Sequence, residues 1–178
     1  MSTTPLVAEL ERLAQMLAAH ESGAPEISMA TIAEKVAKEI GVQADEVAIL
    51  ALAQKSRQLH FLFPEKLTKV GAVPLSSTTS LAARTMREGR AEMVNNFTIM
   101  RHAYVFEGVK IEGRSTADMI QKIISAPIQA GGKAVGVIQV SRKGPNIRKA
   151  GPDFTQADVN KVMTLSVALG KLLQHFPV

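Results

Sequence analysis

Two apolar runs separated by a Gly-Gly turn constrain the fold of this chain more than any other feature. Ile123–Gln129 and Ala134–Ser141 flank Ala130–Lys133, which reads AGGK. Gly131 and Gly132 supply the positive φ that a tight hairpin turn needs. The two runs are therefore expected to pair as antiparallel strands.

A second pair of strands is predicted earlier in the chain. Glu46–Leu52 is a short and almost continuous apolar run, which is typical of a buried strand, and Gln58–Phe63 is a second run of strand length. Lys55–Arg57 would form the turn between them. Alternation along the second run predicts that Phe61 and Phe63 point to the same face of the sheet.

Four helices and one further strand complete the pattern. Apolar spacing and start and stop signals predict helices over Pro5–His20, Ser28–Ile40, Ser80–Gly89 and Thr155–Phe176, and a brief strand over Ala91–Asn95. Hairpin strands interrupted by helices in this order indicate an α+β fold, with an antiparallel sheet and helices gathered on one side.

Composition excludes several classes of function. The chain has no Cys, which removes disulfides, thiolate metal sites and thiol nucleophiles. The N-terminus carries acids where a signal peptide would need a cationic start, and no stretch approaches the length of a membrane span. We therefore expect a cytoplasmic protein with no membrane contact.

The net charge of +5 is unevenly distributed along the chain. Residues 1–50 contain three basic and eight acidic residues, whereas residues 101–150 contain nine basic and three acidic ones. The basic middle could face an anionic ligand, or it could be a solvated surface with no partner. Aromatic residues make up only 4% of the chain, too few for base stacking, and residues 31–50 resemble a helix-turn-helix without base-reading side chains. A nucleic-acid partner is not expected.

The order of these segments resembles that of a GAF domain. Ala44–Leu52 (ADEVAILAL) is similar to the family's first strand, and Val73–Asn96 to its Pro-Leu loop, short helix, Gly and strand. Ser125–Gln139 (SAPIQAGGKAVGVIQ) is similar to its Gly-turn hairpin, and Phe154–Val159 (FTQADV) to the start of its last helix. The resemblance covers roughly residues 28–176, and its specific part is the order of the segments.

The resemblance implies a central antiparallel sheet of about five or six strands, with the helices, including the terminal ones, packed mainly on one face. It assigns residues 28–178 to a GAF-like domain and residues 1–27 to an N-terminal helical extension. GAF-like domains mostly bind small molecules or mediate dimers in signalling proteins. The implied function is a stand-alone sensory or regulatory module that binds a small molecule, anionic or not, and signals through helix-mediated dimerisation or a protein partner. The alternative is a protein–protein interaction module with a vestigial pocket and no ligand.

Some activities of GAF-like proteins need residues that this chain lacks. Covalent bilin attachment and methionine sulfoxide reduction in the family depend on Cys, which is absent here. No catalytic constellation such as G-x-S-x-G is present, and no His has a metal-site spacing to another His or a carboxylate. We expect no enzyme activity, no catalytic residues, no metal and no cofactor.

The cyclic-nucleotide-binding members of the family share a set of residues over the last hairpin and helix, and this chain matches half of it. Lys143, Phe154 and Asp158 match, whereas Arg142 replaces an Asn and Val159 replaces a Glu. In that family these residues serve the fold as well as the ligand. The partial match does not predict cyclic-nucleotide binding.

A polar group in the middle of the chain is the candidate ligand site. In GAF-like domains the cavity lies between the sheet and the segment that corresponds here to roughly residues 79–114. The candidate ligand-binding residues are Asn95, Asn96, Phe97, Met100, Arg101 and His102. Their amide, guanidinium and imidazole donors beside apolar side chains would suit a small molecule, and Arg101 would suit a carboxylate or phosphate. The alternative is a polar loop over a core that Met side chains fill.

Two further features concern surfaces. Arg142–Lys149 is basic and precedes a helix start, but Asp153 and Thr155 stand where a helix cap belongs, so we expect a surface contact there rather than a phosphate site. The leucine stripe of Pro5–His20 could pack on its own core, or it could meet Val159–Phe176 in a homodimer.

Overall fold

The computed structural model describes residues 5–19, 28–69, 72–97 and 119–176. Within them, the α-helices are α1 (Pro5–Ala18), α2 (Met29–Ile40), α3 (Leu81–Glu88) and α4 (Gln156–Leu173), and the short 3-10 helices are η1 (Ala44–Glu46) and η2 (Glu65–Leu67). The strands are β1 (Val47–Ala53), β2 (Gln58–Phe63), β3 (Ala72–Pro74), β4 (Glu92–Val94), β5 (Met119–Ala130) and β6 (Lys133–Gly144). Every helix and strand predicted from the sequence within these residues is confirmed.

The strands form one antiparallel sheet in the order β3-β2-β1-β6-β5-β4. The hairpin of β5 and β6 is its longest part, and it turns at Gly131 and Gly132, whose φ angles are 59° and 79°. Both glycines therefore adopt the left-handed conformation that the Gly-Gly turn predicts. The α+β fold with an antiparallel sheet is confirmed.

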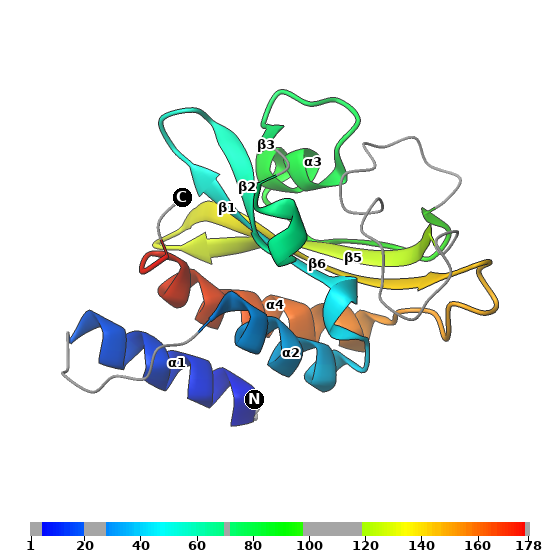
Figure 1. The fold of residues 1–178 in the computed structure, drawn as a ribbon, viewed down its shortest axis with the longest axis horizontal. Coiled ribbons are helices and arrows are strands. Elements are labelled where there is room, and N and C mark those ends of the chain that lie inside the picture. Colours follow the sequence, from blue (N-terminus) through cyan, green and yellow to red (C-terminus); the bar gives the residue numbers. More distant parts are fainter. Residues whose placement is uncertain (1–4, 20–27, 70–71, 98–118, 177–178) are drawn as a thin grey trace.

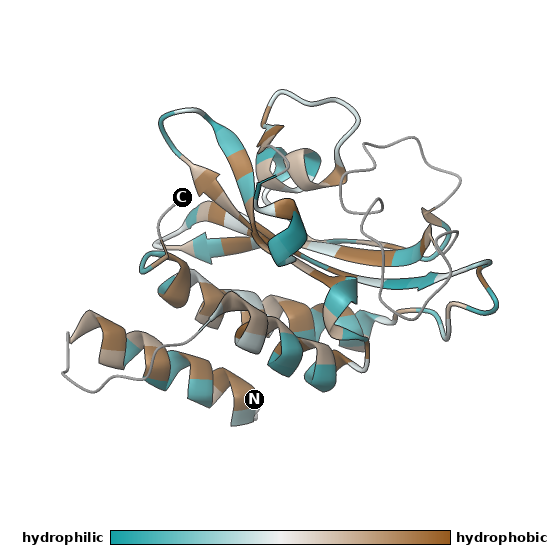
Figure 2. Ribbon diagram, in the orientation of Figure 1, coloured by the Kyte–Doolittle hydropathy of each residue, from teal (hydrophilic) through white to brown (hydrophobic). Residues whose placement is uncertain are grey.

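Helices cover the two faces of the sheet unequally. Helices α1, α2 and α4 lie on one side, and α3 lies on the other (Figure 1). Ile49 and Ile138 point into the core under α2 and α4, whereas Leu50 and Val137 point into the core under α3. Because both faces of the central strands are covered, these strands are apolar without alternation. Figure 2 shows this as brown along the sheet and along the faces of α2 and α4 that meet it.

The helix ends follow the local signals in the sequence. Ser28, Ser80 and Thr155 are N-caps whose hydroxyl oxygens accept from backbone N–H groups three residues later. Gly41 and Gly89 end α2 and α3 with φ angles of 88° and 65°, in the left-handed region. These caps fix where each helix meets the sheet.

The hairpin is longer than the sequence predicts. Strand β5 begins at Met119 rather than Ile123, and β6 continues to Gly144 rather than ending at Ser141. The added ends contain polar residues, which is why they look like loop, but they pair with each other, as in Lys122 opposite Arg142. Arg142 and the two residues after it therefore belong to a strand, and the basic loop is shorter than expected.

The prediction that Phe61 and Phe63 share a face is wrong. Ile49 pairs with Phe63 but the next residue, Leu50, pairs with Phe61, so the ladder contains a β-bulge at Leu62. Phe61 consequently lies in the core under α3, whereas Phe63 packs against the core under α2 and α4.

Helix α1 packs on α2 and α4 of its own chain. Leu6, Val7 and Leu10 are buried there, and Glu11 accepts an ion-pair hydrogen bond from Lys171 of α4 at 3.2 Å. The helix assigned to the N-terminal extension thus shares one core with the residues assigned to the GAF-like domain. None of the helices described here combines the length and apolarity needed to cross a membrane.

Candidate functional site

Asn95, the first of the candidate ligand residues, binds the backbone of the chain itself. Its Nδ2 donates to the carbonyl oxygen of Phe154 at 3.1 Å, and its Oδ1 accepts from the N–H of Phe154 at 2.9 Å. These two bonds tie the end of β4 to the segment that leads into α4. The amide of Asn95 is therefore occupied by a structural pairing in this structure.

The other candidates divide into described and undescribed residues. Phe97 is buried in the core under α3, and Asn96 is exposed. Met100, Arg101 and His102 lie outside the described residues. The structure thus brings Asn95 and Phe97 to the same end of the sheet, with Asn96 exposed between them.

The pairing of Asn95 predicts a loss of stability on its removal. Asn95→Ala is expected to lower the free energy of unfolding by about 1–2 kcal/mol, because a half-buried donor and acceptor of Phe154 lose their partners. Chemical denaturation monitored by circular dichroism measures this change. Asn96→Ala is the matched control, and it should be close to neutral because Asn96 is exposed. Equal stability of the two variants would contradict the structural role.

A chain of buried hydroxyl and amide groups joins α3 to the sheet. The hydroxyls of Thr85 in α3 and Ser125 in β5 are 2.7 Å apart, and Gln139 Nε2 donates to Ser125 at 3.2 Å. All three side chains are buried. Because each buried polar group finds a partner, this contact fixes the position of α3 over β5 and β6.

The residues that match the cyclic-nucleotide set hold the fold in this structure. Phe154 lies under the Arg142 guanidinium at 4.7 Å, and Asp158 completes a capping box with Thr155. The backbone N–H of Lys143 donates to the buried Glu46 carboxylate at 2.6 Å. Each of the three matching residues therefore has a structural contact that needs no ligand.

The start of α4 is capped by Thr155, as the sequence predicts, but not by Asp153. Thr155 Oγ1 accepts from the N–H of Asp158 at 3.3 Å. Asp153 instead forms an ion pair with Lys122 at 2.8 Å, where it neutralises a lysine that is almost fully buried. Asp153 therefore supports the polar end of β5 rather than the helix terminus.

A hollow on the surface lies where β5 begins and β6 ends. We call it the β6–α4 hollow; it has a volume of about 780 Å³ and is lined by Met119, Gln121 and residues 145–149. Arg148 and Lys149 contribute cations, and Met119 and Ile147 are 41% and 40% exposed. Sequence reasoning noted the basic loop but missed its apolar neighbours, because Met119 was not recognised as part of a strand.

Similarity to known proteins is found at the level of structure. No family model and no curated protein matches the sequence. The chain superposes on the GAF domain of a phosphoenolpyruvate-protein phosphotransferase from Acinetobacter with a TM-score of 0.62 at 16% identity, over 98% of this chain and 95% of that one. The fold is that of a GAF domain.

The GAF fold is also shared with proteins of other functions. Residues 122 to 287 of a methyl-accepting chemotaxis protein give a TM-score of 0.59 at 14% identity, over 95% of both chains. A free methionine-R-sulfoxide reductase from Neisseria meningitidis, solved with its substrate, gives 0.56 at 14% identity, over 98% of this chain and 93% of that one. One GAF fold thus serves signalling proteins and enzymes, so function has to be argued from this chain's own residues.

Proposed function

We propose that this chain is a GAF-type sensory or regulatory module. It binds a small molecule on the α3 side of the sheet, and its helical layer of α1, α2 and α4 passes the bound state to a second copy or to a protein partner. The GAF domain of a phosphotransferase and residues 122 to 287 of a chemotaxis protein have the same fold, which supports a regulatory class of function.

The observation that carries this proposal is that β5 contacts both layers within five residues. Ser125 of β5 bonds to Thr85 of α3 on one face. On the other face, the Gln129 carbonyl of β5 lies so close to Gly170 of α4 that a Cβ there would collide with it. A shift of α3 on ligand binding would therefore press through β5 onto α4, because packed layers move as discrete units.

A second function is favoured by the packing under α3. Among the described side chains of that core, Leu50, Leu59 and Val137 have no exposed surface. A core that is filled to this degree would suit a protein–protein interaction module without a ligand. The two functions differ in whether a molecule copurifies with the chain.

Native mass spectrometry of the full chain purified from cells tests this difference. The sensory function predicts a reproducible mass excess under gentle conditions that is lost on denaturation. A bare chain mass in repeated gentle preparations, with no thermal stabilisation by a panel of small metabolites, would contradict ligand binding and leave the interaction module.

The helical layer also predicts an effect on assembly. Val167 of α4 is 54% exposed, the most exposed large apolar side chain among the described residues. If α4 forms a homodimer contact, Val167→Glu should convert dimer to monomer, because it places charges in an apolar contact. Light scattering after gel filtration measures the mass. Thr78→Glu, an exposed change on the α3 side, should leave the dimer intact. A monomeric parent chain would contradict this mode of output.

A further inference from the structure

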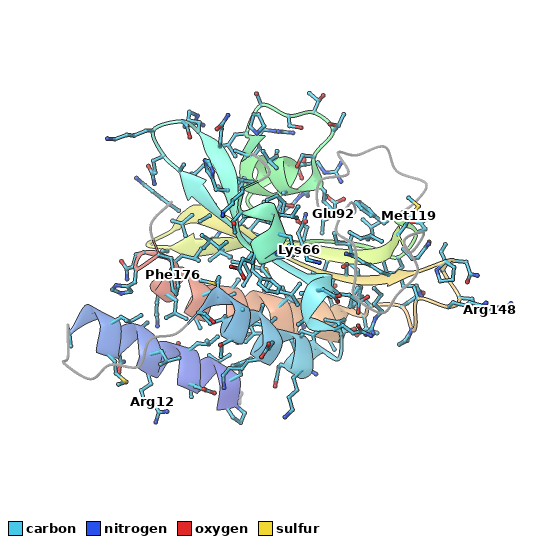
Figure 3. All side chains as sticks on the ribbon, in the orientation of Figure 1. Arg12, Lys66, Glu92, Met119, Arg148 and Phe176 are labelled. Atoms are coloured by element: carbon cyan, nitrogen blue, oxygen red, sulfur yellow. The ribbon has the colours of Figure 1, made fainter. Side chains whose placement is uncertain are left out.

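Beyond the module function, we propose that the β6–α4 hollow binds a soluble organic anion, with an apolar body and a carboxylate, phosphate or sulfonate group. The hollow is separate from the α3 side of the sheet, and it uses described residues only. Figure 3 shows two of its side chains, Met119 and Arg148, at the same end of the molecule, far from Phe176.

The cations of the hollow are available for a ligand. Neither Arg148 nor Lys149 has an ion pair or a side-chain hydrogen bond among the described residues, and both are exposed. The neighbouring cations differ in this respect. Lys122 pairs with Asp153 at 2.8 Å, and Arg142 stacks on Phe154 and donates to the Gly41 carbonyl at 3.2 Å. The basic residues that support the fold are thus distinct from the two that face the hollow.

Among the described residues that line the hollow, none carries a carboxylate. The side chains that surround Arg148 and Lys149 are the apolar Met119, Pro145 and Ile147 and the amides Gln121 and Asn146. A ligand that contacts these side chains meets the positive charge of Arg148 and Lys149, which favours an anion. The amides add neutral donors and acceptors that can orient it.

The apolar side chains of the lining indicate that the ligand also has an apolar part. Met119 and Ile147 are two of the four large apolar side chains that stand exposed in the described residues, and both line this hollow. Exposed apolar surface that gathers beside cations gains by covering an apolar group. The hollow is open to solvent, so a ligand would lie along its floor, and apolar side chains beside cations match an amphiphilic small molecule rather than a bare inorganic ion.

The loop that forms the hollow is held in shape from its base. Asn146 Oδ1 accepts from the N–H of Lys149 at 2.9 Å, and the Asn146 carbonyl accepts from the N–H of Ala150 at 3.1 Å. Ala150 packs closely on Gly144: a Cβ added at Gly144 would lie 3.0 Å from the backbone of Ala150. The buried Gln121 side chain also donates to the Gly144 carbonyl at 2.8 Å. The closed base presents Ile147 and Arg148 in a fixed arrangement, which lowers the entropic cost of binding.

Fluorescence titration of the full chain with anilinonaphthalene sulfonate, an aromatic organic anion, tests the proposal. The probe should bind, and the double change Arg148→Gln and Lys149→Gln should weaken its Kd by about tenfold, as the loss of two partly screened charge contacts implies. The control is Lys55→Gln with Lys133→Gln, which removes the same charge from two exposed turns away from the hollow. Equal Kd values for the two double variants, or no binding by the parent chain, would overturn the proposal.

Two further probes separate charge from apolar contact. Neutral N-phenylnaphthylamine should bind at least tenfold more weakly than the sulfonate, and inorganic phosphate at equal concentration should not displace the sulfonate. Ile147→Ser should weaken binding of the sulfonate severalfold, whereas Met93→Ser on β4, a comparably exposed apolar position, should not. Equal binding of the neutral probe, or displacement by phosphate alone, would contradict an amphiphilic anion site.

The location and the source of the ligand are settled by two measurements. Backbone and side-chain amide shifts in a nitrogen-proton spectrum should change on titration at Gln121 and Asn146. Changes confined to other residues would overturn the assignment of the site. Sedimentation with phosphatidylglycerol vesicles, lost in the Arg148 and Lys149 double variant, would show a membrane surface as the partner and overturn the soluble ligand. A mass excess in native mass spectrometry that persists in the Arg148→Gln and Lys149→Gln double variant would belong to the α3 side, so the two proposals can fail separately.

Discussion

Replacing Gly170 with alanine is expected to lower the free energy of unfolding by about 2 kcal/mol, although alanine is the better helix former. A Cβ at this position would collide with the carbonyl oxygen and carbon of Gln129 in β5. Gln129 is paired with Ala134 in the hairpin, so its backbone cannot easily rotate away and α4 has to lift from the sheet. The gain in helix propensity, about 1 kcal/mol, offsets only part of this cost.

Chemical denaturation measures the change, and a larger side chain sharpens it. Gly170→Val should cost more than Gly170→Ala, about 4 kcal/mol, because overpacking adds to the poorer helix propensity of valine. Lys161→Ala, an exposed change on the same helix, should be neutral or slightly stabilising. If Gly170→Ala is as stable as Lys161→Ala, α4 does not pack this closely on β5. That result would contradict the contact on which the proposed signal path depends.

The local elements were predictable because their signals are local. Ser28 and Gly41 bracket α2 as cap and stop, and Gly131 and Gly132 set the hairpin. The role of Gly170 was not predictable in the same way. A glycine inside a helical pattern normally indicates only a less stable helix. Here glycine is required because the backbone of a strand about 40 residues earlier in the chain lies against it.

The errors concern residues whose partners are distant in sequence. The polar ends of β5 and β6 look like loops, but Lys122 is buried because Asp153 and the Gly151 carbonyl accept from it. Phe63 lies on the other face of the sheet because of a β-bulge, which the alternation of apolar and polar residues does not predict. Burial of a charge and insertion of a bulge both depend on the register in which the strands pair. This register cannot be read from one amino-acid sequence.

The residue types of the candidate site can be read from the sequence, but the partners of their side chains cannot. Amides, cations and Met side chains suggested small-molecule recognition, but Asn95 is used to hold Phe154, and its two bonds span 59 residues of chain. The β6–α4 hollow joins Met119 to a loop more than 25 residues later. Only the pairing of β5 with β6 brings these segments together, so the strand ends had to be known before the hollow could be recognised.

Glu46→Leu is expected to lower the free energy of unfolding by about 3 kcal/mol. The Glu46 side chain belongs to a residue that is 4% exposed, and it accepts from the N–H of Gln43 at 3.0 Å and from the N–H of Lys143 at 2.6 Å. Leucine is similar in size but leaves two backbone donors without these acceptors, and each costs about 1–3 kcal/mol. The carboxylate therefore joins η1 to the end of β6, and its loss should loosen the strand end that leads to the β6–α4 hollow.

Denaturation and hydrogen exchange together test this role of Glu46. The amides of Gln43 and Lys143 should exchange faster in Glu46→Leu, whereas Glu34→Leu, an exposed change on α2, should alter neither exchange nor stability appreciably. Glu46→Gln retains one carbonyl oxygen and should lie between the parent chain and the leucine variant, because its amide nitrogen cannot accept the second N–H. A glutamine variant as unstable as the leucine variant would show that the charge matters more than the geometry of acceptance, since charged acceptors form the stronger hydrogen bonds. Unchanged exchange at Lys143 in Glu46→Leu would contradict the contact itself, and with it the fixed base from which the loop of residues 145–149 is presented.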